Sequence, residues 1–519
     1  MFNDHAAPLA FPKGLAIAFA AIAFALVIAV SPARAATDLY VAPAPTGSDA
    51  NDCLSAATPC ATVGAAVVKA ASGDTIHLAA GAYSEQVVID KPVSLVGPNA
   101  GIDPNTGTRG AEATFSGAGP VFSLQNGSSG VIGVTIDGLA FSNVTGTGYN
   151  GVITVPGFGA GNVTIANNSF SNVTEEAIGY HGNTGLAAPL GSNWLVAQNR
   201  VEQVTGANRS GMFFGNLSDS VIRDNVIIDP ARSGIVVTGG TDVTVSGNTV
   251  SGAVFGVNIG TDATSNPVGN VIVEGNTVTD SGVGIVVNSP SSVPDVTIGF
   301  NRLDGNTTGL FSNATSSIAA ENQWWGCNAG PTDAACDSVA GNVDFSPWLV
   351  LSLTADPASV ETGDTATLSA DLTTNSDGAV AGGAAITDGS TIAFSVDAGT
   401  LSASTGATAG GVASVTFTAG ATPASVLAQA TLDGQSVTTT LTVTAAPPPP
   451  TPSPTPAPTP TGTPTPPTSA TPTPTASAPA GASLPDTSMG SPAGTLPLAV
   501  LAIFSGAILL LERRRNARR

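Results

Sequence analysis

Residues 243–248 read VTVSGN, and this stretch holds the pattern that decides the fold. Apolar and polar residues alternate, and the stretch then ends in a glycine and an asparagine. Alternation with a period of two is typical of a strand with one buried face, whereas a helix repeats its apolar residues every three or four positions. The stretch therefore predicts a short strand that ends in a bend.

The asparagine after this strand recurs along the chain in steps of 21 to 31 residues. Each copy has an apolar residue, or Ala319 for the last, three positions before it and another apolar residue two positions after it, so Trp324 is predicted to point inward. The copies are Asn168, Asn199, Asn225, Asn248, Asn276, Asn301 and Asn322. One coil of this length cannot bury its apolar side but stacked coils can, so the pattern predicts a solenoid. We expect each Asn to take the left-handed bend conformation, with stacked amides hydrogen-bonded along the column.

A second column of small residues opens another strand in the same coils, at Ala177, Gly211, Gly234, Gly256, Gly284 and Gly309. Before the repeats, residues 62–71 place apolar side chains on one helical face, which predicts a helix that caps the open end of the solenoid.

The N-terminus has the pattern of a secretory signal peptide over residues 1–35. Lys13 is followed by an apolar run, and Ala33-Arg34-Ala35 supplies a small-x-small cleavage site. The mature chain is therefore expected to begin near Ala36, outside the cell.

The C-terminal residues 484–519 have the order of a surface anchor. Leu484, Pro485, Asp486, Thr487 and Ser488 precede an apolar stretch at 496–511 and an arginine-rich tail. That order predicts a transmembrane helix with a cytoplasmic tail, and it resembles the sorting signal read by sortases. Ser488 stands where that signal has Gly, so linkage to the cell wall by a sortase and simple retention in the membrane both stay open.

The composition excludes several classes of partner and site. The chain has 15 basic residues against 36 acidic ones, a net charge of −21, which argues against nucleic acid as a partner. The four cysteines form two close pairs in a secreted chain, so we expect the disulfides Cys53–Cys60 and Cys327–Cys336. The three histidines are scattered, and no metal site or cofactor is predicted, with weakly bound calcium as the open alternative.

Motifs at both ends of the solenoid resemble those of pectin-lyase-like right-handed parallel β-helix proteins. The entry motifs are the loop between Cys53 and Cys60 and the segments 73–76 and 81–83, and the exit motif runs from Asn322 to Gly326. The repeats between them are similar to those shared by carbohydrate-binding proteins and sugar hydrolases. The resemblance implies a right-handed parallel β-helix over residues 36–349, but it specifies no activity, because this fold supports many functions.

The residues after the solenoid predict a second all-β domain followed by an extended stalk. Residues 350–445 carry short alternating runs that predict a β-sandwich, and they resemble the Ig-like domains of invasin and intimin. Residues 446–483 are rich in Pro and Thr, which predicts an extended stalk of about 3.1 Å per residue.

One constellation stands out for chemistry. Two positions before the small-residue column, successive coils carry Glu175, Arg209 and Arg232. Equivalent positions of neighbouring coils lie about 4.8 Å apart, so Glu175 is expected to pair with Arg209. Tyr180, His181 and Phe213 follow on the same coils, which makes these six residues candidates for binding an acidic sugar. A surface ion-pair ladder with no function is the alternative.

Three functions follow from this organisation. The first is an anchored surface protein that binds an extracellular polysaccharide or a host glycan, or mediates adhesion. The second is an extracellular polysaccharide lyase or glycoside hydrolase, although no complete catalytic set can be identified. The third is a display scaffold without catalysis.

Overall fold

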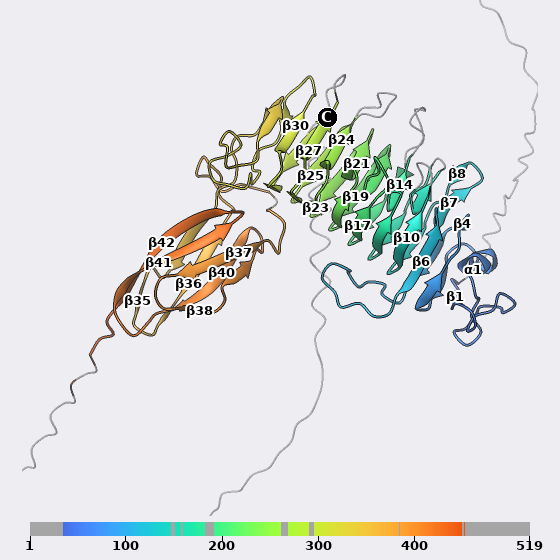
Figure 1. Cartoon of the computed structure of the whole chain (residues 1–519), viewed down its shortest axis with the longest axis horizontal. Helices are drawn as coiled ribbons and strands as arrows, with labels where there is room; N and C mark the ends of the chain where they lie inside the picture. The colour runs from blue at the N-terminus through green and yellow to red at the C-terminus, as the bar shows by residue number, and fades with distance from the viewer. Residues whose placement is uncertain are drawn as a thin grey trace, which may run out of the picture. The chain divides into compact units, whose positions relative to one another are not determined.

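Parallel coils stack into a solenoid, and each full coil gives one strand to each of three sheets (Figure 1). The computed structural model describes residues 35–448 and residue 451, except residues 147–150, 157–158, 182–190, 261–267, 290–294 and 384. The predicted signal peptide up to residue 34, the stalk beyond residue 451 and the sorting signal lie outside the described residues.

The strands of each sheet follow one another coil by coil. Sheet A contains β1 (Asp38–Val41), β2 (Asp74–Leu78), β5 (Val93–Val96), β9 (Thr135–Asp137), β12 (Thr164–Ala166), β16 (Leu195–Ala197), β19 (Leu217–Arg223), β22 (Thr241–Ser246), β25 (Gly269–Glu274), β28 (Val296–Gly299), β31 (Ile318–Ala319) and β33 (Val343–Asp344), and β15 (Gly191–Ser192) pairs with β19. Sheet B contains β3 (Gly81–Tyr83), β6 (Ala113–Ala118), β10 (Ala140–Thr145), β13 (Ser169–Val173), β17 (Arg200–Val204), β20 (Val226–Pro230), β23 (Thr249–Ser251), β26 (Thr277–Thr279) and β29 (Arg302–Asp304). Sheet C contains β4 (Val87–Ile89), β7 (Phe122–Asn126), β11 (Ile153–Val155), β14 (Ile178–Tyr180), β18 (Met212–Gly215), β21 (Ser233–Thr238), β24 (Phe255–Gly260), β27 (Val283–Asn288), β30 (Thr308–Ser312) and β32 (Val339–Gly341), and β8 (Ser129–Gly130) pairs with β7.

Inward side chains of the three sheets form one continuous core. Stacked rings fill its first half, where Phe141 lies 5.5 Å from Phe115 and 4.7 Å from Phe170 between ring centroids. Helix α1 (Val63–Lys69) begins after the N-cap Thr62 and buries Val63, Ala66 and Val67, so it closes the N-terminal end of this core where the sequence predicts a cap.

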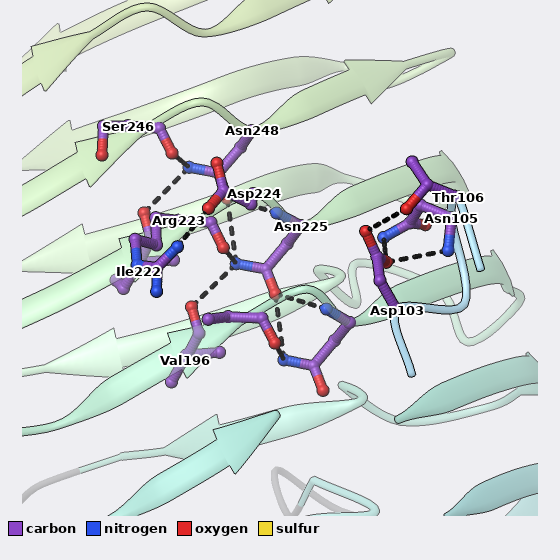
Figure 2. Close-up of polar contacts among 12 residues, drawn as sticks. Asp103, Asn105, Thr106, Val196, Ile222, Arg223, Asp224, Asn225, Ser246 and Asn248 are labelled. Carbon is purple, nitrogen blue, oxygen red and sulfur yellow. Dashed lines mark hydrogen bonds and ion pairs between the residues drawn. The ribbon is translucent and has the colours of Figure 1, made fainter. Parts of the chain in front are cut away.

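An asparagine ladder runs inside the solenoid where the coil turns from sheet A to sheet B. Asn225 donates from Nδ2 to the carbonyl of Val196 and to Oδ1 of Asn248, both at 2.9 Å, and its backbone N–H donates to the same Oδ1 (Figure 2). The fully buried members that repeat this pattern are Asn168, Asn199, Asn225, Asn248, Asn276 and Asn301, and they end on Gln323. The predicted amide column is therefore present.

Two details of the predicted column are wrong. The left-handed residue is the one before each ladder position, such as Asn167, Asp224 and Phe300, and the ladder residues themselves do not take positive φ. The last ladder member is Gln323 and not Asn322, which occupies the left-handed position at φ 58°.

Because of this shift of one residue, Trp325 and not Trp324 takes the inward position that the sequence predicts for Trp324. Trp325 enters the solenoid core, and Trp324 is buried in the core of the region that follows. There its Nε1 donates to Asp433 at 2.7 Å, and Arg302 Nε donates to the same carboxylate at 2.8 Å. Both indoles are fully buried, so neither presents a platform for a sugar.

Residues 352–444 form two further sheets. The four-stranded sheet contains β34 (Ser352–Asp356), β36 (Thr365–Asp371), β40 (Val412–Thr418) and β38 (Thr400–Leu401), and the five-stranded sheet contains β35 (Ser359–Glu361), β42 (Gln435–Thr444), β41 (Ala424–Leu432), β37 (Thr391–Val396) and β39 (Thr405–Ala407). Leu368 and Phe417 of the first sheet share a core with Phe394 and Leu441 of the second.

Both predicted disulfides are confirmed. Cys53 bonds to Cys60 and Cys327 to Cys336, with Cα atoms 5.1 and 5.2 Å apart, within the normal range. No helix among the described residues is long and apolar enough to cross a membrane, and the stretch 496–511 lies outside them.

Candidate functional site on sheet C

A cluster of charged side chains lies where two coils enter sheet C. Glu175 and Glu176 precede β14, and Arg209 precedes β18, which pairs with β14 in register. Arg209 Nε lies 3.0 Å from Glu175 Oε2, and its Nη1 lies 3.8 Å from Glu176 Oε1. The pairing of Glu175 with Arg209 expected from the coil register is therefore present, and Glu176 joins it.

His181 and Phe213 lie beside these charges. Phe213 points outward from β18 while Phe214 is fully buried, and His181 follows β14. Their rings stack at 4.4 Å between centroids and 15° between planes, and His181 Nε2 lies 3.9 Å from Glu176 Oε2. Gly179 pairs with Phe213, and a Cβ at position 179 would come within 2.9 Å of the Gly151 backbone N and 3.3 Å of His181 Nε2, so the absence of a side chain allows both close approaches.

Burial shifts the protonation of two members of the cluster. It raises the pKa of Glu176, an effect that Glu175 reinforces and that Arg209 and backbone hydrogen bonds partly offset. Burial, with the nearby positive charge of Arg209, lowers the pKa of His181 to about 4. The imidazole is therefore neutral at pH 7, and Glu176 holds a proton more readily than an ordinary glutamate.

Of the six candidate residues, four come together: Glu175, His181, Arg209 and Phe213. Tyr180 does not join them, because it lies two residues after Ile178 on β14 and both side chains point into the core. Its ring is fully buried and lies 5.2 Å from Trp194, so a direct contact with a ligand is ruled out for Tyr180.

Arg232 occupies the register position next to Arg209 on the following coil. It is exposed, and within the described part of the chain no carboxylate forms an ion pair with it. The sequence interpretation missed Glu176, although its position beside Glu175 could have indicated it. The charge available to a ligand is therefore on Arg232, since Arg209 is already engaged by two carboxylates.

Acidic residues elsewhere have structural positions. Asp224 and Asp280 take positive φ at bends between strands, as the sequence interpretation expects for Asp in turns, whereas Asp229 and Asp242 take positive φ within β20 and β22. Across the described ranges, no group of three or more His, Cys, Asp or Glu side chains is arranged to hold a metal ion.

Comparisons with known proteins identify the fold of this region. Residues 101–272 match the family described as "Right handed beta helix region". Among solved structures, pectate lyase Pel9A is 16% identical over 59% of this chain and 78% of its own, with a TM-score of 0.37. A rhamnogalacturonan lyase is 12% identical over 59% and 87%, with a TM-score of 0.36. PfbA, a surface adhesin of Streptococcus pneumoniae, is 11% identical over 55% and 88%, with a TM-score of 0.29.

No curated protein matches the sequence significantly. The three stacked parallel sheets and the match over residues 101–272 agree on the architecture. This all-β chain is built around a right-handed parallel β-helix.

Proposed function

We propose that this protein is a cell-surface polysaccharide-binding protein, and that it contacts glycan on sheet C around His181 and Phe213. The observation that carries the proposal is the stacked His181–Phe213 pair beside the Glu175–Arg209–Glu176 charges.

A sugar ring presents apolar C–H faces and polar hydroxyl edges. An outward aromatic pair supplies apolar contact area, and a neutral imidazole keeps that area free of charge at pH 7. The adjacent carboxylates and the Arg209 guanidinium group are nearly buried and pair with one another, so they leave few polar atoms for hydroxyl groups. An acidic sugar unit would pair with Arg232, the exposed cation of this column.

The chain outside the described residues fits display on a cell surface. We propose that the signal peptide exports the chain, and that the segment from Leu484 to the arginine-rich tail holds it, either through a sortase or by membrane retention. Residues 350–445 would serve as an Ig-like spacer, and the Pro-rich residues 446–483 as an extended stalk.

A glycan panel tests this proposal. The full-length protein, solubilised in detergent, should be retained by at least one polysaccharide, and His181→Ala with Phe213→Ala should reduce retention at least about tenfold, the equivalent of about 1.4 kcal/mol. Phe311→Ala is the matched control. Phe311 lies in the same outward column of sheet C as Phe213, four coils further along the solenoid. Equal loss in both variants, or no retention on any glycan, would rule out this site.

Catalysis is a second candidate, favoured by one observation. Glu176 has a raised pKa and lies beside His181, so the cluster holds a group suited to give a proton. Release of reducing or unsaturated sugar ends by the wild type, lost in Glu176→Gln while retention persists, would establish cleavage. Retention without release in both proteins would leave binding as the function.

A further inference from the structure

An aromatic pair also lies on the outer face of sheet A, at the N-terminal coil. Tyr40 of β1 and His77 of β2 are register partners, and their rings stack at 5.2 Å between centroids. His77 Nε2 lies 3.1 Å from the carboxylate of Asp38, and both of these side chains are partly exposed. The equivalent positions on the next coils are Val96, Asp137 and Ala166, so the aromatic pair is a local feature of this coil.

The disulfide loop forms a fixed wall next to this pair. The backbone of Tyr40 bonds to both ends of the loop, donating to the Cys53 carbonyl at 2.8 Å and accepting from the Cys60 N–H at 2.9 Å. Lys69 Nζ holds the same segment through the carbonyl of Asn51 at 2.8 Å.

A pocket of about 160 Å³ lies between the loop and the strand ends. Its lining includes the rings of Tyr40 and His77, Ala56 and Pro59 of the loop, and Leu78 and Ala79 at the end of β2. This volume is well below the roughly 300 Å³ at which sites for drug-sized molecules begin, so it suits a single ring.

We propose that this pocket is a second carbohydrate site, which takes one uncharged pyranose unit. The aromatic, proline and alanine side chains provide the apolar surface that a sugar ring contacts. The Tyr40 hydroxyl, the imidazole and the Asp38 carboxylate provide polar groups for its edge. The proposal commits to an uncharged sugar because the lining contains no Lys or Arg and Asp38, which lies beside His77, would repel a uronate. It does not depend on the site on sheet C.

Ligand-detected NMR with methyl glycosides of neutral hexoses and N-acetylhexosamines tests the proposal on the full-length protein. We expect weak binding, with a Kd on the order of 1 mM. Tyr40→Ala should reduce the binding at least about tenfold, Tyr40→Phe should retain most of it, and Thr75→Ala on the same strand pair should leave it unchanged. The His181→Ala and Phe213→Ala variant should bind like the wild type, which separates this site from the one on sheet C.

If Tyr40→Ala lowers the melting temperature, Ala56→Trp offers a second route, because it fills the pocket from the loop without altering either strand. The proposal is wrong if no glycoside binds, or if Ala56→Trp binds as well as the wild type. A peptide of residues 449–466 that binds while no glycoside does would show that the pocket takes proline rings, which also overturns the proposal.

Discussion

Two polar columns run along the same solenoid, and they differ in repetition, charge and burial. The asparagine ladder repeats one neutral amide over six coils and buries every copy. The column of Glu175, Arg209 and Arg232, called here the charged column, is limited to three coils, carries charges of both signs and reaches the surface at Arg232. A residue that recurs in every coil is required by the structure of the coil itself, whereas a residue confined to a few coils serves a local purpose.

The energetics of the two columns differ for the same reason. Each ladder amide satisfies backbone groups that the bend would otherwise leave buried without a partner. In the charged column, Arg209 compensates the nearly buried carboxylates of Glu175 and Glu176, while Arg232 compensates no described carboxylate. We therefore expect truncation of a ladder asparagine to cause the largest loss of stability, truncation of Arg209 a smaller loss, and truncation of Arg232 the smallest.

The largest effect is expected in the ladder. Asn225→Ala removes its bonds to Val196 and Asn248 and leaves buried backbone groups unsatisfied, which should reduce the free energy of unfolding by about 3 kcal/mol or more. Urea unfolding measures this loss. Asn288→Ala, which removes an exposed amide pair with Asn313, is the control and should change the free energy by less than about 0.5 kcal/mol. Similar losses in both variants would contradict a structural role of the ladder.

In the charged column, we expect Arg209 to contribute to stability and Arg232 to contribute to binding. Arg209→Ala leaves two nearly buried carboxylates without their cation and should destabilise the fold by about 2–3 kcal/mol. Arg232→Ala should change stability by less than about 0.5 kcal/mol but weaken retention of an anionic glycan. Thermal unfolding and glycan retention, measured on both variants, test the division. If Arg232→Ala destabilises as much as Arg209→Ala, the whole column is structural.

The last effect concerns pH. The folded protein lowers the pKa of His181 to about 4, so between pH 6.5 and 4 the unfolded chain takes up a proton there that the folded chain does not, and stability falls on acidification. Burial raises the pKa values of Asp304 and Asp337 to about 6, so these groups act in the opposite direction and lose stability as pH rises through 6.

His181→Asn separates the two effects. Relative to the wild type, the variant should gain stability steadily as pH falls from 6.5 towards 4, because it lacks the imidazole that takes up a proton in the unfolded chain and not in the folded chain. Unfolding free energies at several pH values in this range measure the gain. A difference between the two proteins that does not change with pH would show that His181 titrates normally.

The sequence predicts much of the solenoid, because strand alternation and a repeated amide are local signals. It identifies the six ladder asparagines, both disulfides and the outward direction of Phe213. It fails at Asn322, since asparagine suits both the left-handed position and the ladder position, and the glutamine at 323 supplies the same amide. Only the three-dimensional register distinguishes the two.

The candidate site is predicted less completely. The coil spacing places Glu175 beside Arg209, but the stacking of His181 on Phe213 depends on the conformation after β14, for which no repeated pattern exists. Tyr180 is a different kind of error, because the alternation of Ile178, Gly179 and Tyr180 already indicates an inward side chain. Phe300 at φ 58° also follows no local rule, since a bulky residue seldom takes that conformation.

The pairing of β35 with β42 has a mechanical consequence. The two strands run parallel, with Ser359, Val360 and Glu361 opposite Thr442, Val443 and Thr444. A force that pulls the chain before β34 away from the chain after β42 draws these strands in opposite directions along their own axes. Their hydrogen bonds are then sheared together and cannot be opened one at a time, so the region should resist stretching along the chain better than the same bonds would resist peeling.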